Sequence, residues 1–175
     1  CSACGANTYR DTDNHRHTAC EAQAVCAKGE KISADSKIAI RTCSACGANT
    51  YRDVDDHRHT ECETQPTCDV GQLISADTKT AQQACSACPD NTYQTATDHR
   101  TESCTAQPTC DAGQLISADT KTAQQACSAC PDNTYQTATD HRIESCTAQT
   151  LCGTGERISP DSNTEARTCS PCPEN

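Results

Sequence analysis

Residues 85–126 read CSACPDNTYQTATDHRTESCTAQPTCDAGQLISADTKTAQQA and contain four cysteines but no Phe, Trp or Met. The larger aliphatic side chains of this segment are Leu115 and Ile116, so it cannot bury much apolar surface by itself. We therefore expect covalent cross-links, rather than a hydrophobic core, to decide its fold.

The same spacing of cysteines recurs along the whole chain. The cysteines stand 42 residues apart in four columns without insertion or deletion: Cys1, Cys43, Cys85, Cys127 and Cys169; Cys4, Cys46, Cys88, Cys130 and Cys172; Cys20, Cys62, Cys104 and Cys146; and Cys26, Cys68, Cys110 and Cys152. The period defines four repeats, residues 1–42, 43–84, 85–126 and 127–168, and the start of a fifth at 169–175. Small repeats of this kind share contacts with their neighbours. We expect an elongated tandem array with similar junctions.

The composition indicates a disulfide scaffold from an oxidising compartment. Cysteine accounts for 18 of the 175 residues, whereas the chain has thirteen Val, Leu and Ile residues and four Tyr. Dense cysteine in a polar chain is typical of disulfide-bonded extracellular proteins, so we expect an extracellular or cell-surface location. No apolar run approaches the roughly 20 residues of a membrane span, so we expect none in this segment.

The charge distribution argues against nucleic acid as a partner. The net charge is −10, and it is acidic in residues 43–84, 85–126 and 127–168, while residues 1–42 sum to +1. No basic stripe and hardly any aromatic side chains are present to contact phosphates or stack on bases. An acidic, polar surface is typical of a hydrated exterior.

Local patterns favour turns and short strands over helices. Cys88–Tyr93 predicts a turn that leads into a strand, with Asn91 in the left-handed conformation, and Gly113 suits a similar turn. Gln114–Ser117 predicts a short strand. Thr120–Ala126 lacks an amphipathic stripe, so we expect coil there. The predicted fold class is a small, disulfide-rich, mostly β or irregular array of 42-residue repeats.

At these residues the chain resembles the cysteine-rich repeats of tumour necrosis factor receptor ectodomains and the related growth-factor-receptor-like repeats of surface proteins. The shared marks are Cys-Pro-x-x-Thr-Tyr at Cys88–Tyr93 and Cys130–Tyr135, and Cys-x-x-Gly at Cys110–Gly113. The resemblance extends over the whole chain, once per repeat. Two departures are Asn, where the family usually has Gly before Thr-Tyr, and the lack of the interleaved extra disulfide that is frequent in the family.

The resemblance implies a pairing of neighbouring cysteines. Carried over, it pairs Cys4–Cys20, Cys46–Cys62, Cys88–Cys104 and Cys130–Cys146, and then Cys26–Cys43, Cys68–Cys85, Cys110–Cys127 and Cys152–Cys169. Cys1 and Cys172 are then expected to pair outside the fragment, as they would if the chain were a window on a longer array. From the residues alone, four cysteines per repeat leave three internal connectivities open.

Metal and catalytic sites are weaker interpretations of the same residues. Cys-x-x-Cys with the His15–His17 and His57–His59 tracts could suggest zinc, but the tracts are not kept in later repeats, and we expect solvated turn residues. The acidic tracts Asp11–Asn14 and Asp53–Asp56 lack a full calcium loop, so solvated acidic turns are favoured over a calcium site. No nucleophile, acid or base stands apart from the repeat. We expect no metal, no cofactor and no enzyme.

Threonine suggests glycosylation. The chain has no Asn-x-Ser/Thr sequon. Thr67 and Thr109 stand in Cys-x-x-x-x-Thr-Cys, a spacing similar to the O-fucose site of epidermal-growth-factor-like modules. We predict O-linked glycans at these residues; the alternative is that threonine simply suits polar strands.

Two functions from different classes remain. The leading hypothesis is a structural rod of an extracellular filament, cell-surface fibre or stalk, in which the chain contacts neighbouring repeats or associates with itself. It depends on the insertion-free period and the near-absence of a core. The alternative is a ligand-binding receptor ectodomain, which the resemblance implies. A secreted enzyme or inhibitor is disfavoured. Many further repeats in the full-length gene would favour the rod, and a membrane span with a signalling domain the receptor.

Overall fold

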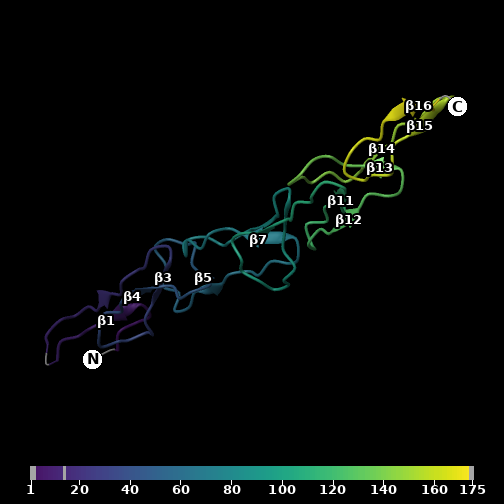
Figure 1. The fold of residues 1–175 in the computed structure, drawn as a ribbon. Helices are drawn as coiled ribbons and strands as arrows, with labels where there is room; N and C mark the ends of the chain where they lie inside the picture. Colours follow the sequence, from purple (N-terminus) through teal and green to yellow (C-terminus); the bar gives the residue numbers. More distant parts are fainter. Residues whose placement is uncertain (1–2, 14, 174–175) are drawn as a thin grey trace. The chain divides into compact units, whose positions relative to one another are not determined.

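The computed structural model describes residues 3–13 and 15–173, and these residues form short strands and turns without a helix (Figure 1). The chain forms two compact units, one of residues 1–68, 74–86 and 98–102 and the other of residues 69–73, 87–97 and 103–175. No helix in the described residues has the length and apolarity to cross a membrane. The expected fold class, short antiparallel strands repeated in tandem in a disulfide-rich chain, is confirmed.

The first half of each repeat is a hairpin of very short strands. β1 pairs with β2 so that Thr8 lies opposite Ala22 and Tyr9 opposite Glu21. The same antiparallel register recurs in the later repeats. These strands are β1 (Thr8–Tyr9), β2 (Glu21–Ala22), β5 (Thr50–Tyr51), β6 (Glu63–Thr64), β9 (Thr92–Tyr93), β10 (Thr105–Ala106), β13 (Thr134–Tyr135) and β14 (Thr147–Ala148).

The second half of each repeat leads into the next repeat through a second hairpin. β3 pairs with β4, which places Ile32 opposite Cys43. β11 pairs with β12 and β15 with β16 in the same way. The strands are β3 (Glu30–Ile32), β4 (Cys43–Ala45), β7 (Gln72–Ile74), β8 (Cys85–Ala87), β11 (Gln114–Ile116), β12 (Cys127–Ala129), β15 (Glu156–Ile158) and β16 (Cys169–Pro171).

Left-handed residues set the turns that precede these strands. Asn91 has a φ of 61° and Gly113 a φ of 79°, as expected, and their equivalents in the other repeats also have positive φ. Asparagine tolerates this region because its side chain hydrogen-bonds locally, and glycine because it has no Cβ. Lys121, in the Thr120–Ala126 segment for which we expected coil, also adopts a positive φ of 58°, and its equivalent Lys79 has a φ of 56°.

Neighbouring cysteines close a loop in each half-repeat. The described residues contain the disulfides Cys4–Cys20, Cys26–Cys43, Cys46–Cys62, Cys68–Cys85, Cys88–Cys104, Cys110–Cys127, Cys130–Cys146 and Cys152–Cys169. Their Cα atoms lie 5.6–5.8 Å apart, within the usual range for a disulfide. Cys172 is exposed and unpaired in the structure, and Cys1 lies outside the described residues.

Buried apolar side chains are few and are distributed one or two to a half-repeat. Ile32, Ile74 and Ile116 are each 1% exposed, and the half-cystines before the glycine turns are almost as buried. Tyr9 and Tyr51 are buried in the first two repeats. A single isoleucine per repeat gives about 2 kcal/mol of burial, which cannot order a 42-residue segment alone.

Glutamine side chains replace part of the missing core. Gln23 is 2% exposed; its Nε2 donates to the carbonyls of Ser36 and Ala39, and its Oε1 accepts from the backbone N–H of Arg41 at 2.7 Å. Gln65, Gln107 and Gln149 occupy the same place in their repeats. Each glutamine therefore ties the first hairpin to the loop that closes the second disulfide.

Candidate binding surfaces at the repeat junctions

A ladder of backbone hydrogen bonds forms the first junction. Within the first unit, the N–H groups of Cys26, Gly29 and Ile32 donate to the carbonyls of His57, Arg52 and His59 at 2.9, 2.8 and 2.9 Å. The donors come from the second half of repeat 1 and the acceptors from the first half of repeat 2. The spacing of three residues between donors gives the ladder a fixed register.

The junction of repeats 3 and 4, within the second unit, has the same ladder. The N–H groups of Cys110, Gly113 and Ile116 donate to the carbonyls of His141, Gln136 and Ile143 at 2.8, 2.8 and 3.1 Å. Because the acceptors are main-chain carbonyls, Arg52 and Gln136 can occupy equivalent positions without changing the bond. The ladder is therefore a property of the repeat and tolerates sequence divergence.

Histidine is buried at these junctions, so the prediction that His57 is a solvated turn residue is wrong. The exposed fraction of His57 is 6%, and its Nδ1 accepts from the N–H of His59 at 3.1 Å. Its Nε2 lies 3.2 Å from the carbonyl of Ala27, which assigns the proton to Nε2. The ring is buried because repeat 1 covers it. His15 and His17 are exposed, as expected.

The arginine after each buried histidine also contacts the preceding repeat. Arg58 donates to the carbonyls of Ala24 and Gln23 at 3.0 and 2.7 Å. Arg142 does the same to Pro108 and Gln107 in the second unit. Both ring nitrogens of His57 and the guanidinium of Arg58 are engaged in these contacts, which makes the His-Arg pair a junction element.

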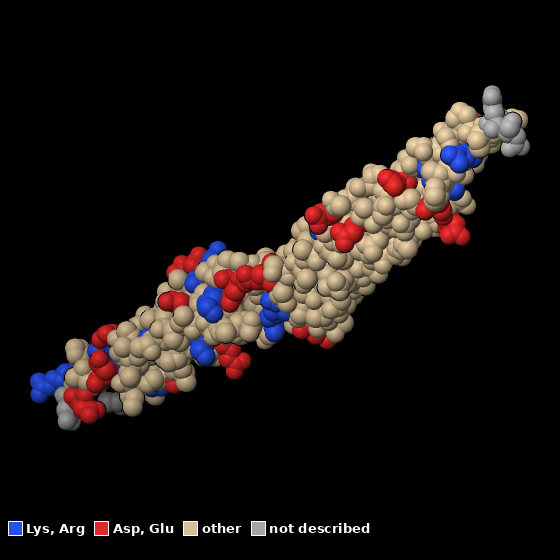
Figure 2. Space-filling view, viewed as in Figure 1, with Lys and Arg blue, Asp and Glu red and all other residues tan. Residues whose placement is uncertain are grey.

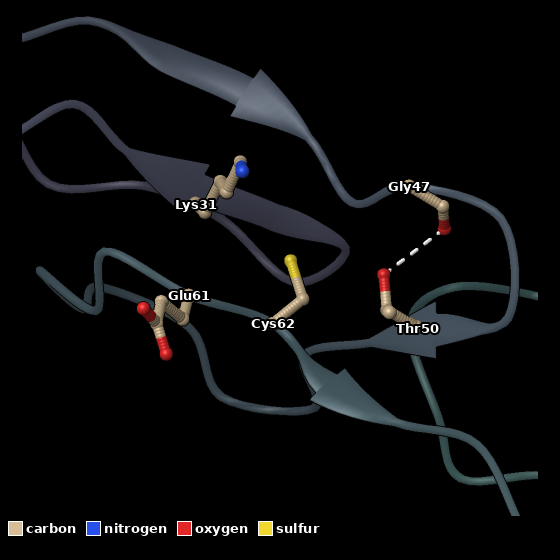
Figure 3. A pocket seen from close by; sticks show the side chains of 5 residues that line it. All are labelled: Lys31, Gly47, Thr50, Glu61 and Cys62. Atoms are coloured by element: carbon tan, nitrogen blue, oxygen red, sulfur yellow. Dashed lines mark hydrogen bonds between the residues drawn. The ribbon is translucent and has the colours of Figure 1, made fainter.

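A shallow hollow lies on the first unit beside the junction of repeats 1 and 2 (Figure 3). It has a volume of about 300 Å³ and is lined by Lys31, Gly47, Thr50, Glu61 and Cys62. Lys31 comes from β3, Thr50 from β5, and Glu61 with Cys62 from the segment that leads into β6. The Thr50 hydroxyl donates to the Gly47 carbonyl at 3.0 Å, which holds one wall.

Two opposite charges at this hollow have no partner among the described residues. The described residues provide neither an ion pair nor a side-chain hydrogen bond to the Lys31 ammonium or the Glu61 carboxylate. Both side chains are exposed, whereas Cys62 is half-buried through its disulfide to Cys46. An ammonium and a carboxylate that are not paired within the protein can both contact a bound molecule.

Lys31, Gly47 and Glu61 of the hollow differ from their equivalents in later repeats, whereas Thr50 and Cys62 are kept. Lysine at position 31 is replaced by Leu73 and Leu115 in repeats 2 and 3 and by Arg157 in repeat 4. Glycine at position 47 becomes Pro89 and Pro131, and glutamate at position 61 becomes Ser103 and Ser145. The combination of a basic residue at position 31 and a glutamate at position 61 is therefore seen only at the first junction of the described residues, although the backbone ladder is common to the repeats. The sequence already indicated this site, because the residue types at these positions change between repeats.

The acidic tracts and the cysteine clusters do not build a metal site in the described residues. Asp55 accepts from the backbone N–H of Lys28 at 3.1 Å and lies 3.8 Å from its ammonium. Cys26, Glu30 and Cys43 lie close together, but the two cysteines form a disulfide and offer no thiolate. Asn14, which belongs to the predicted acidic turn, lies outside the described residues.

The two threonines predicted to carry glycans are exposed and lie on junctions. The Thr67 hydroxyl donates to the Asp98 carboxylate at 3.3 Å, and the Thr109 hydroxyl donates to Asp140 at 3.4 Å. A glycan on either oxygen would remove the donor from this contact. O-glycosylation of both residues stays a prediction.

Side-chain contacts shift the pKa of Tyr51 and the pKa of Asp90. The hydrogen bond from the Tyr51 hydroxyl to Glu63, together with burial, raises the pKa of Tyr51. The Lys121 ammonium, 2.7 Å from the Asp90 carboxylate, lowers the pKa of Asp90 below its ordinary value of 3.8. The contact between Lys121 and Asp90 therefore stabilises the fold at pH values above the ordinary pKa of aspartate. This stabilisation is lost as the pH falls through the lowered pKa of Asp90.

Acidic and basic side chains are both present on the face of the molecule that Figure 2 draws. The face drawn in Figure 2 carries acidic and basic side chains without a continuous basic stripe.

Comparisons with known proteins give similarity at the level of solved structures. No protein-family model and no curated protein matches the chain. A chain of the human RANKL/OPG complex aligns over 94% of this chain and 96% of its own length, with 21% identity and a TM-score of 0.39. A chain of the mouse RANKL–OPG complex aligns over 75% of this chain and 95% of its own length, with 20% identity and a TM-score of 0.34.

Proposed function

We propose that this chain is a non-catalytic, extracellular binding array that recognises a protein partner at the hollow beside the first junction. The observation that carries the proposal is the unpaired Lys31 and Glu61 at a position where the repeats otherwise diverge. A side chain whose only role is to stabilise the repeat does not need to differ between repeats. The side chains of a binding surface do need to differ, because specificity requires groups that the other repeats lack.

The chemistry of the hollow favours a peptide or protein surface as the partner. Lys31 and Glu61 together complement a segment that carries one acidic and one basic group. The remaining lining, with the Cys46–Cys62 disulfide and the Gly47 backbone, is small and permits close approach of a partner chain. Disulfides throughout the chain support an extracellular location for this binding.

The structural rod, which the sequence favours first, is supported less well. Identical backbone ladders suit a rod, but they serve a binding array equally. A rod of uniform repeats does not require a charged hollow at one of its junctions. We therefore prefer the ligand-binding alternative.

A binding screen with matched variants tests this function. The disulfide-intact chain is presented to a panel of secreted proteins and ectodomains, alongside the Lys31→Leu/Glu61→Ser variant, which takes the residues of repeat 2 and repeat 3. Lys28→Val is the control, because it removes a lysine outside the hollow and introduces the residue of repeat 2.

We expect saturable binding of a protein that the double variant weakens at least about tenfold and the control leaves unchanged. Absence of any saturable partner would contradict the proposal. Equal binding by the wild type and the double variant would also contradict it, since the hollow would then not be the recognition site.

A further inference from the structure

One sulfur of the Cys46–Cys62 disulfide is accessible from the hollow beside the first junction. Cys62 is half-buried and lines the hollow, whereas Cys46 is 3% exposed. Figure 3 shows the Cys62 sulfur pointing toward the side of the hollow on which Lys31 lies. Because thiol–disulfide exchange requires a thiolate to attack a sulfur directly, a thiol in the hollow reaches Cys62 and not Cys46.

Backbone carbonyl oxygens lie against sulfurs of several other disulfides. The cysteines whose Sγ lies 3.5–3.9 Å from such an oxygen are Cys43, Cys85, Cys104 and Cys127. Cys104 is the equivalent of Cys62 in repeat 3. Among the described residues, no carbonyl oxygen has this contact with the Cys62 sulfur. The partial negative charge of a carbonyl oxygen opposes an incoming thiolate, so Cys62 is less protected than these four cysteines.

A carboxylate lies beside two of the other disulfides. An oxygen of Glu30 lies within 4.8 Å of both sulfurs of the Cys26–Cys43 disulfide, and the same arrangement recurs in repeat 4. A negative charge at this distance repels a thiolate, which is the reactive form of a thiol. The hollow at the Cys46–Cys62 disulfide instead contains the Lys31 ammonium, which attracts an anion.

The charges of the hollow complement a small thiol that is also a zwitterion. The carboxylate of such a thiol pairs with the Lys31 ammonium and its ammonium with the Glu61 carboxylate, neither of which has a partner among the described residues. The equivalents beside Cys104 are Leu73 and Ser103, which carry no charge. A volume of about 300 Å³ is at the small end of ligand sites and accommodates cysteine or a short cysteinyl peptide.

We propose that the Cys46–Cys62 disulfide is a site of thiol–disulfide exchange with small zwitterionic thiols. The thiolate of the small molecule attacks Cys62 Sγ and forms a new S–S bond, while the bond between Cys46 and Cys62 breaks. Cys46 Sγ leaves with the electron pair of the broken bond and takes a proton from water. One disulfide therefore replaces another without net oxidation or reduction, and the small thiol stays bound to Cys62 in the hollow.

The exchange opens the loop that holds the first hairpin of repeat 2. The Cys46–Cys62 disulfide has a sequence separation of 16 residues; β5 lies inside its loop, and β6 begins at the residue after Cys62. Exchange at this disulfide requires no protein partner at the hollow, so it can be tested apart from the proposed function.

Peptide mapping by mass spectrometry, after a brief exposure to free cysteine, locates the first disulfide to react. All chains carry Cys1→Ser and Cys172→Ser, because neither cysteine takes part in a disulfide of the described residues. N-ethylmaleimide then stops the exchange and labels the freed thiol. We expect the label on Cys46 and a cysteinyl group on Cys62, at a rate at least about fivefold above that of the Cys88–Cys104 disulfide.

Neutral variants separate recognition of the zwitterion from simple access to the sulfur. Lys31→Gln/Glu61→Gln removes both charges of the hollow, and Lys28→Gln is the control, because it removes a lysine outside the hollow. We expect the double variant to slow the exchange of cysteine at Cys62 about fivefold and the control to leave it unchanged. The thiol 2-mercaptoethanol has neither a carboxylate nor an ammonium, so it should react with the parent and the double variant at equal rates.

Three outcomes would overturn the proposal. A different disulfide that reacts first in the parent chain would place the exchange site elsewhere. A double variant that reacts with cysteine as fast as the parent does would show that the charges do not recognise the thiol. Equal slowing of cysteine and 2-mercaptoethanol in the double variant would indicate altered access to the sulfur. Circular dichroism of the unreacted chains verifies the fold, and the mapping of the parent chain tests the site without a hollow variant.

Discussion

Buried glutamine side chains connect the two hairpins of each repeat, where a larger domain would use aliphatic packing. Gln65 is 2% exposed, and its amide bonds to the Ala81 carbonyl and the Gln83 N–H at 3.0 and 2.7 Å. A buried amide of this kind orders its loop only while its bonds are satisfied, because each unpaired group carries a desolvation cost.

Replacement of Gln65 by alanine leaves the Gln83 N–H and the Ala81 carbonyl without their partner. We expect a loss of about 2 kcal/mol in the free energy of unfolding, measured by urea denaturation with the disulfides intact. Gln82→Ala is the matched control, since Gln82 is exposed. Equal stability of the two variants would show that Gln65 does not hold the loop.

The contact between Tyr51 and Glu63 makes an alkaline titration informative. The hydroxyl donates to the carboxylate at 3.0 Å, and this bond raises the pKa of Tyr51 above its ordinary value of 10.0. The contact therefore stabilises the fold below that value and is lost as the pH rises through the raised pKa.

Glu63→Gln removes the negative charge and should move the tyrosinate absorbance transition of Tyr51 to lower pH. Glu61→Gln is the control, because the Glu61 side chain has no bond to Tyr51. A transition that the two variants shift equally would contradict a specific role for Glu63.

The glycine turns are the elements on which adjacent repeats pack. Gly113 has a φ of 79°, and a Cβ there would meet the Thr164 methyl and the Asn163 side chain at 3.0 Å. Gly155 has a similar φ of 83° but no neighbour within 4 Å. Backbone strain on replacement is therefore common to the two turns, whereas the packing conflict is particular to Gly113.

Gly113→Ala should destabilise the chain more than Gly155→Ala does. We expect about 1 kcal/mol for the strain in both variants and at least about 1 kcal/mol more at Gly113, from chemical denaturation of the monomer. Indistinguishable losses would contradict the packing of repeat 4 on this turn.

The sequence predicts the turns better than the junctions. Asn91 and Gly113 were predictable because few residues tolerate positive φ, and the strand at Gln114–Ile116 because apolar residues follow the turn. The burial of His57 was not predictable, since it depends on a carbonyl of the preceding repeat. The glutamine column repeats visibly, but an amide in a polar chain does not by itself indicate burial.

Both the sequence and the fold were needed to identify the charged hollow. The departure of Lys31 and Glu61 from the repeat was present in the sequence, but adjacent positions in space come from segments thirty residues apart. The fold brings β3 and the segment before β6 together through the junction ladder. Without the register of the junction ladder, it could not be seen that Lys31 and Glu61 line the same hollow.

At the scale of the whole molecule, the disulfides are the structures on which every proposed surface depends. Their loops have sequence separations of 16 or 17 residues, each of which contributes about 3 kcal/mol in the chain-entropy account. The hollow contains Cys62, and the ladders begin at half-cystines such as Cys26. Without the cross-links, the few buried isoleucines cannot hold these elements together.

Reduction under native buffer conditions tests this central claim most directly. The hydrodynamic radius and far-ultraviolet circular dichroism of the chain are measured before and after complete reduction, with alkylation to prevent reoxidation. We expect the reduced chain to expand to the radius of an unfolded chain and to lose the strand and turn signal. An unchanged radius and spectrum after verified reduction would contradict it, because the fold would then be held by contacts other than the disulfides.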